Sequence, residues 1–151
     1  MKRWLISAAV VAGIILSAGQ AAAAPPDPVD VTIPNTDCGF PVDIHVIGKT
    51  KTINVGDDRF IVPAPGQRAT LEVLPPNGKT AQYVATGTFH VQVLADGSQE
   101  FKVTGRNILT RPGIGIFLTT GNFNFALNPD GSELRPFAGS GKVVNICEVL
   151  A

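Results

Sequence analysis

The sequence predicts an all-β protein, either an antiparallel β-sandwich or a closed β-barrel of about nine or ten strands with one disulfide. The first reason is a series of short runs from Val29 onward in which apolar and polar residues alternate, with Gly, Pro, Asn and Asp between the runs. The second is that no window outside the N-terminal segment has the i, i+3, i+4, i+7 apolar spacing of an amphipathic helix. The third is a pair of cysteines near the two ends of the chain.

The N-terminal segment has the pattern of a secretory signal peptide. Lys2 and Arg3 precede an apolar run from Trp4 to about Leu16, and small residues at A-x-A spacing follow. The apolar run is shorter than the roughly 20 residues that span a bilayer. We therefore expect residues 1–24 to be cleaved and the mature protein to be secreted and extracellular, with no stable membrane insertion after cleavage. The alternative is an uncleaved membrane anchor.

The charge balance of the mature chain limits its partners. Loss of Lys2 and Arg3 reduces the twelve basic residues to ten, against twelve acidic residues, and no cluster of Lys and Arg remains. A protein that neutralises phosphates needs a basic patch, so nucleic acid is not expected as a partner. Residues 25–37 are expected to be an extended leader, because Pro25-Pro26-Asp27-Pro28 cannot enter a helix. A single β domain is expected over residues 38–151.

The first half of this domain contains short strand patterns. In the first of them, Val42, Ile44 and Val46 fall on one face, and Asp43 and His45 fall on the other. Strands are expected in the runs PVDIHVIGK, TKTINV, RFIVP and RATLEVL, followed by a hairpin turn at Asn77-Gly78.

The second half contains longer patterns. In the longest run, YVATGTFHVQVL, the apolar residues Phe89, Val91 and Val93 face one way and polar residues the other. Further strands are expected in the runs QEFKVTG, NILTR, GIGIFLTT, NFNFALN and KVVNICEVL. Turns or breaks between them are expected at Asp96-Gly97, Pro112 and Asp130-Gly131.

Cys38 and Cys147 are expected to form one disulfide, since an exported chain with two cysteines most simply pairs them. The bond would close a loop of roughly 100 residues, for which the loop-entropy model gives a stabilisation of about 4.7 kcal/mol. Because the Cα atoms of a disulfide lie within about 7 Å, the first and last strands of the core should pair or face each other. The alternatives are two free thiols, or a nucleophilic Cys38 with His45 as its base.

Three stretches carry a resemblance to known proteins: DCGFPVDIHVIGKTK, TGTFHV with DGSQEFKVTGRNIL, and GIGIFLTTGNFNF. With the signal peptide and a late Cys, they resemble small secreted β-rich proteins of high-GC Gram-positive (actinobacterial) bacteria. The resemblance covers most of the mature chain and implies bacterial origin, export and a β-sandwich or β-barrel fold. Its motifs are those of strands and turns, so it implies no catalytic residue.

Asp43, His45 and His90 are the candidate metal ligands. Asp43 and His45 lie about 7 Å apart on one strand face, and two His with a carboxylate suit zinc. The chain has no H-x-H pair and no H-E-x-x-H motif, and the sequence does not make the strands of His45 and His90 neighbours. We therefore expect these side chains to face water, without a metal or other cofactor.

The polar residues near the C-terminal end offer one binding candidate and no catalytic one. Asn122, Asn124 and Asn128 could form a sugar-contacting face, with an ordinary solvated face as the alternative. The serines of the mature chain follow glycines in turn-like sequence, and none lies in G-x-S-x-G.

The sequence thus favours a secreted, non-catalytic β-sandwich domain that binds an unknown extracellular partner or surface. Two alternatives belong to other classes: a carrier that holds a small apolar, lipid-like ligand in a barrel cavity, and a small secreted hydrolase. A closed barrel with an empty apolar interior would favour the carrier. A cleft with clustered carboxylate, His and Ser would favour the enzyme.

Overall fold

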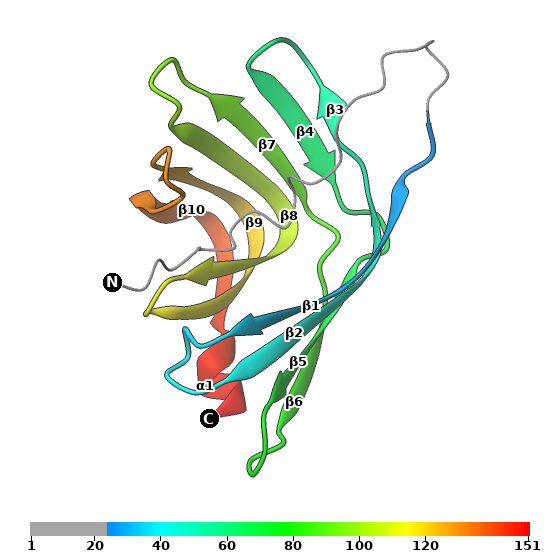
Figure 1. Ribbon diagram of the computed structural model, residues 1–151, viewed down its shortest axis with the longest axis vertical. Helices are drawn as coiled ribbons and strands as arrows, with labels where there is room; N and C mark the ends of the chain where they lie inside the picture. The colour runs from blue at the N-terminus through cyan, green and yellow to red at the C-terminus, as the bar shows by residue number, and fades with distance from the viewer. Residues whose placement is uncertain (1–23) are drawn as a thin grey trace.

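The chain forms two antiparallel β-sheets in a computed structural model that describes residues 24–151. The four-stranded sheet has the order β1-β2-β5-β6, and the six-stranded sheet has the order β10-β9-β8-β7-β4-β3 (Figure 1). The elements are β1 (Asp27–Asn35), β2 (Val42–Thr50), β3 (Ile53–Asn54), β4 (Arg59–Pro63), β5 (Arg68–Val73), β6 (Thr80–Val84), β7 (Thr88–Val93), β8 (Gln99–Arg111), β9 (Gly115–Leu127), β10 (Glu133–Asn145) and helix α1 (Ile146–Leu150).

The predicted all-β class and the single disulfide are confirmed. Two facing sheets fit the sandwich alternative, and no pairing among the described strands closes either sheet on itself. The predicted signal peptide lies, up to residue 23, outside the described residues. Over residues 24–151, no helix has the length and apolar character needed to cross a membrane.

The expected leader over residues 25–37 requires a correction, because β1 occupies Asp27–Asn35 and pairs with β2 along its whole length. Val29, Val31 and Ile33 supply the partly buried side of this strand. Its prolines are tolerated because β1 is an edge strand, where a missing N–H interrupts no ladder. The domain therefore begins before residue 38.

Three other runs differ from their expected form. The longest run, YVATGTFHVQVL, is split, since β6 ends at Val84 in one sheet and β7 begins at Thr88 in the other. The runs expected as separate strands on either side of residues 105 and 121 are instead the continuous strands β8 and β9. The last run leaves the sheet at Asn145, whose side chain caps α1 by accepting from the Cys147 backbone N–H.

The main core lies between two layers. One is the four-stranded sheet, and the other is formed by the C-terminal half of β8 and the N-terminal half of β9. Ile44 and Leu71 come from the first sheet, Ile116 and Leu118 from β9, and Ile146 from α1, all at most 5% exposed. Burial of each such side chain contributes roughly 1.5–3 kcal/mol. This core anchors only half of β8 and β9; their other halves continue beyond it.

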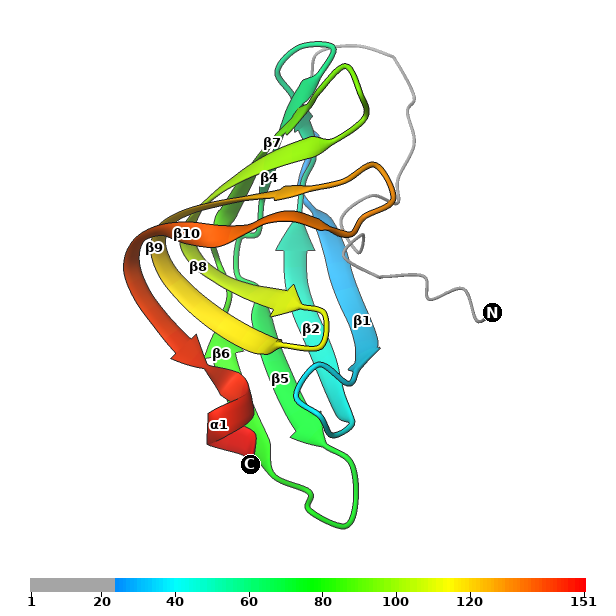
Figure 2. The same cartoon turned by 90° about the vertical axis from the view of Figure 1, so that its left-hand side faces the viewer.

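A row of glycines marks the point where the long strands bend. Gly105, Gly121 and Gly141 stand side by side across β8, β9 and β10, and all three have positive φ angles of 78°, 138° and 141°. A Cβ on Gly121 would lie 2.3 Å from the carbonyl oxygen of Ser140. Any other residue would collide with the neighbouring strand, so glycine allows the close, curved packing that Figure 2 shows for β8–β10.

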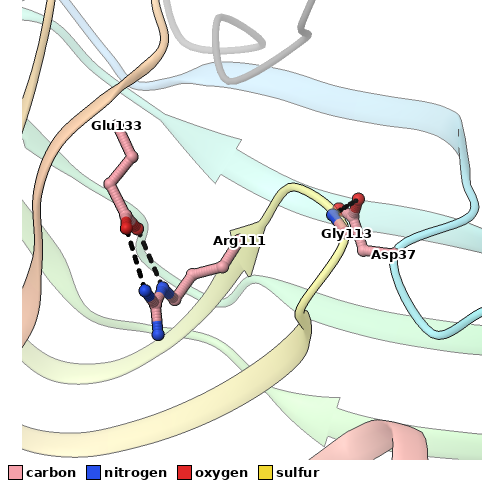
Figure 3. A network of polar contacts seen from close by, with 4 residues as sticks. All are labelled: Asp37, Arg111, Gly113 and Glu133. Carbon is pink, nitrogen blue, oxygen red and sulfur yellow. Dashed lines mark hydrogen bonds and ion pairs between the residues drawn. The ribbon is translucent and has the colours of Figure 1, made fainter.

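The bend brings opposite ends of these strands together. The 13 residues of β9 would span roughly 40 Å if straight. Arg111 is paired with the first residue of β9 and Glu133 with the last, yet Arg111 donates two hydrogen bonds of 2.8 Å to Glu133 (Figure 3). The ion pair therefore links the two ends of the bent sheet. The Arg111 guanidinium also lies 5.9 Å from the centroid of the Phe137 ring.

The Arg111–Glu133 ion pair should make the free energy of unfolding depend on pH in the acidic range. Hydrogen bonds from Arg111 lower the pKa of Glu133 from its ordinary 4.5, so the pair stabilises the folded chain above that value and is lost as pH falls through the lower, folded pKa. We expect a double-mutant cycle with Arg111→Gln and Glu133→Gln to give a coupling of about 1 kcal/mol near pH 7 and a weaker coupling at acidic pH, as Glu133 becomes protonated. Urea denaturation measures it, and equal coupling at both pH values would contradict the assignment.

The disulfide joins the two sheets. Cys38 lies in the β1–β2 loop and Cys147 in α1, with their Cα atoms 5.1 Å apart. Beside it, the backbone N–H of Gly113 in the β8–β9 turn donates to the Asp37 carboxylate at 2.9 Å (Figure 3). The expected proximity of the first and last core strands is thus realised across the sandwich, through a loop and a helix.

Candidate functional site

The structure places one of the three candidate metal ligands, His90, on a different sheet from Asp43 and His45. His45 lies on β2 of the four-stranded sheet, where its Nε2 is 2.8 Å from the Asp30 carboxylate, whereas His90 lies on β7 of the six-stranded sheet. Asp43 is partly buried and pairs in register with Glu72. Within residues 24–151, no group of three or more His, Cys, Asp and Glu is placed to hold a metal ion.

The asparagine row is also divided. Asn122 and Asn124 are exposed on one face of β9. Asn128 follows the end of β9, where its backbone N–H donates to the carbonyl of Ser132 at 2.8 Å and its side chain donates to the Ser132 hydroxyl at 3.0 Å. Asn128 therefore stabilises the β9–β10 turn, and only the other two share a surface.

The serine hydroxyls of two turns are used locally. Ser98 and Ser132 each donate a hydrogen bond of 2.6 Å to the aspartate two residues before, Asp96 and Asp130. These bonds, with those from the backbone N–H of the same serines, lower the pKa of both aspartates. Neither serine is oriented by a histidine, as a hydrolytic nucleophile would be.

A surface hollow of about 250 Å³ lies on the half of the six-stranded sheet beyond the glycine row. Five strands, β4, β7, β8, β9 and β10, supply its polar side chains. We call it the polar trough and define it by Arg59, His90, Gln92, Glu100, Lys102, Asn124 and Arg135. The apolar residues Val55, Phe60, Ile61, Val91 and Phe101 complete its lining.

Strand register places these side chains in two rows. His90 pairs with Lys102, which pairs with Asn124, so these three form one row across β7, β8 and β9. Gln92 pairs with Glu100 and Arg59 with Gln92, which forms the second row. Side chains two residues apart on a strand share a face, so both rows point to the same side of the sheet.

The opposite face of the same strands is aromatic. Phe101, between Glu100 and Lys102, stacks on Phe125 with ring centroids 4.5 Å apart and planes within 4°. Phe89 meets Phe101 edge to face at 6.5 Å. These contacts hold the central strands of the trough together from behind, so the polar side chains stand on a rigid base.

The trough has an excess of positive charge. It contains Arg59, Lys102 and Arg135 against the single carboxylate of Glu100, and Arg135 is 3.5 Å from that carboxylate. No ion pair within residues 24–151 involves Arg59 or Lys102. Since glycoside hydrolysis needs two carboxyl groups, the one carboxylate among the seven trough side chains does not supply that chemistry.

Sequence reasoning found part of this site. His90 was a metal candidate and Asn124 a binding candidate, and the structure brings these two into one row with Lys102. Arg59 and Arg135 were not identified, because a single charged residue looks like any solvated residue until the strand order places it beside the others. The usable signal was the polar face of each strand; the missing information was the strand order.

No protein-family model, curated protein or solved structure matches the chain. The geometry and charge of the polar trough therefore provide the basis for proposing a function.

Proposed function

We propose that this chain is an exported, non-catalytic domain that binds a polar partner outside the cell through the polar trough. The signal-peptide pattern of residues 1–24 and the disulfide support export, because structural disulfides persist in oxidising compartments. The resemblance to actinobacterial secreted proteins supports a bacterial cell surface as the setting. One observation carries the binding assignment: seven polar side chains from five strands line one hollow.

The trough suits binding better than the two alternatives. Its charged and amide side chains would lose water without compensation beside a lipid-like ligand. Its one carboxylate and one histidine lack a nucleophile or a second acid among the trough residues. Amides, guanidinium groups and an ammonium group held on strands instead form a fixed set of hydrogen-bond donors and acceptors.

A sedimentation experiment with the cell envelope of the producing strain tests this function. We expect the purified protein to sediment with intact envelope material, and Arg59→Gln with Lys102→Gln to weaken this binding roughly tenfold or more, because charge-assisted hydrogen bonds contribute about 1.5–3 kcal/mol each. The fraction bound is measured across protein concentrations, and the supernatant is assayed for released saccharide.

The matched control replaces two exposed cations of the other sheet, Lys49→Gln with Arg68→Gln, and changes the net charge equally. Binding of this variant should equal that of the native chain. Equal loss in both double variants would show nonspecific charge attraction and overturn the assignment of the trough. Accumulation of released saccharide would overturn the non-catalytic assignment.

A further inference from the structure

The cations of the trough are arranged to meet an anion. Arg135 is already 3.5 Å from Glu100, whereas Arg59 and Lys102 have no ion pair within residues 24–151. Both side chains are exposed and project from neighbouring rows of the same sheet face. The chain as a whole has a formal net charge of zero, so this local excess of positive charge is a property of the trough.

The groups around these cations suit hydroxyl-rich surfaces. Gln92 and Asn124 each carry one acceptor and two donor positions, and His90 adds a ring nitrogen of each kind when neutral. The row beyond Asn124, towards the glycines, continues with hydroxyl and amide side chains: Thr88, Thr104, Asn122 and Ser140, in register across β7 to β10. A ligand that crosses these strands would therefore meet hydrogen-bonding groups at every strand.

The trough does not resemble the centre of a protein-protein interface. Such centres are enriched in aromatic residues and depleted of charge, and a few buried aromatic or Arg anchors dominate their energy. Here the aromatic side chains Phe101 and Phe125 stack on the opposite face of the sheet. Five apolar residues also line the hollow: Val55, Phe60, Ile61, Val91 and Phe101. Phe60, Val91 and Phe101 are in register with one another and alternate with the polar positions, so their side chains point to the opposite face and only Val55 and Ile61 remain, at the end of the trough.

We propose that the ligand is an anionic polysaccharide whose carboxylates are bound by Arg59 and Lys102 and whose hydroxyl groups are bound by Gln92, His90 and Asn124. This inference rests on the proposed function and names its ligand class. Strands are spaced about 4.8 Å apart, so the two rows offer a regular series of sites to a linear polymer that lies across them. Carboxylates favour Arg in particular because the guanidinium group binds them with two parallel hydrogen bonds.

Three polymers separate the contributions of charge and backbone. Polygalacturonate carries a carboxylate on each sugar, its fully methyl-esterified form has the same sugar backbone without charge, and polyglutamate carries carboxylates on a peptide backbone. We expect polygalacturonate to bind, with an affinity that decreases as salt concentration increases. The methyl ester and polyglutamate should each bind at least tenfold more weakly in calorimetric titrations of the full mature chain.

The variants connect the binding to the trough. Arg59→Gln with Lys102→Gln should weaken polygalacturonate binding tenfold or more, while Lys49→Gln with Arg68→Gln should leave it unchanged. Far-ultraviolet circular dichroism checks that both variants keep the β-sheet spectrum. Backbone amide shifts on polygalacturonate addition should concentrate in β7, β8 and β9, where the rows lie.

The outcomes distinguish this inference from the proposed function. Equal affinity for polygalacturonate and its methyl ester would overturn the role of carboxylates, and equal or tighter binding of polyglutamate would point to an acidic protein. If no polysaccharide binds while trough-dependent sedimentation with the envelope persists, the ligand class is wrong and the binding function stands. If neither polysaccharide binding nor trough-dependent sedimentation is observed, both proposals fail.

Discussion

Replacing Cys38 and Cys147 with serine is expected to lower the free energy of unfolding by about 3–5 kcal/mol. The bond spans 109 positions of the chain, so its loss greatly increases the conformational freedom of the unfolded state. It also removes the covalent link between the β1–β2 loop and α1, whose Ile146 and Leu150 are fully buried in the core. Urea denaturation of the native chain and the C38S/C147S variant measures the difference.

A neighbouring contact provides the control for this prediction. Asp37→Ala removes the two hydrogen bonds that this carboxylate accepts, from the Gly113 backbone N–H and from the Asn35 side chain, but leaves the disulfide in place. Its cost should be about 1–2 kcal/mol, since each hydrogen bond usually contributes about 0.5–1.5 kcal/mol. If the C38S/C147S variant lost no more than D37A, the disulfide would not be the main constraint between the sheets.

The fold class could be predicted from the sequence because its signals are local. Alternation of Val42, Ile44 and Val46 with polar neighbours depends on the pleat of one strand. The disulfide could be predicted because two cysteines offer a single intramolecular pairing. Neither inference requires knowledge of which strands are neighbours.

The sheet assignments could not be predicted, because the decisive contacts join residues far apart in the chain. Ala85–Gly87 is only a short break in an otherwise continuous pattern, but at this break the chain passes from one sheet to the other. Gly105 and Gly121 looked like strand ends, although in the structure they are the bend inside continuous strands. A glycine permits both a turn and a close strand approach, and only the neighbouring backbone distinguishes them.

The candidate site was only partly predictable for the same reason. His90 and Asn124 were identified from polar positions in their own strands, but their alignment through Lys102 depends on the registers of β7 with β8 and of β8 with β9. Arg135 enters the trough through β10, whose register with β9 is interrupted on both sides of that residue. Periodicity carries no information on such irregular pairing.

Substitution of Gly121 by alanine is expected to cost about 3 kcal/mol or more of folding free energy, because two penalties add. An L-residue is strained at its φ of +138°, at a cost of about 1–2 kcal/mol. The new Cβ would also lie 2.3 Å from the Ser140 carbonyl oxygen and 2.8 Å from the Gly141 Cα, and relief of such overlap typically costs 1–3 kcal/mol. Urea denaturation of G121A against the native chain measures the sum.

Gly56 offers the matched control for this substitution. Its φ of +150° is similar, but a Cβ there would meet nothing closer than 3.9 Å, so Gly56→Ala should cost only the backbone strain. The excess loss in G121A then measures how tightly β9 and β10 pack at the bend. Because this bend brings Arg111 to Glu133, adjustment of the strands in G121A should also reduce the coupling of that ion pair near neutral pH. Equal destabilisation by the two alanines, with the coupling intact, would show that the glycine row does not hold the sheet in its curved form.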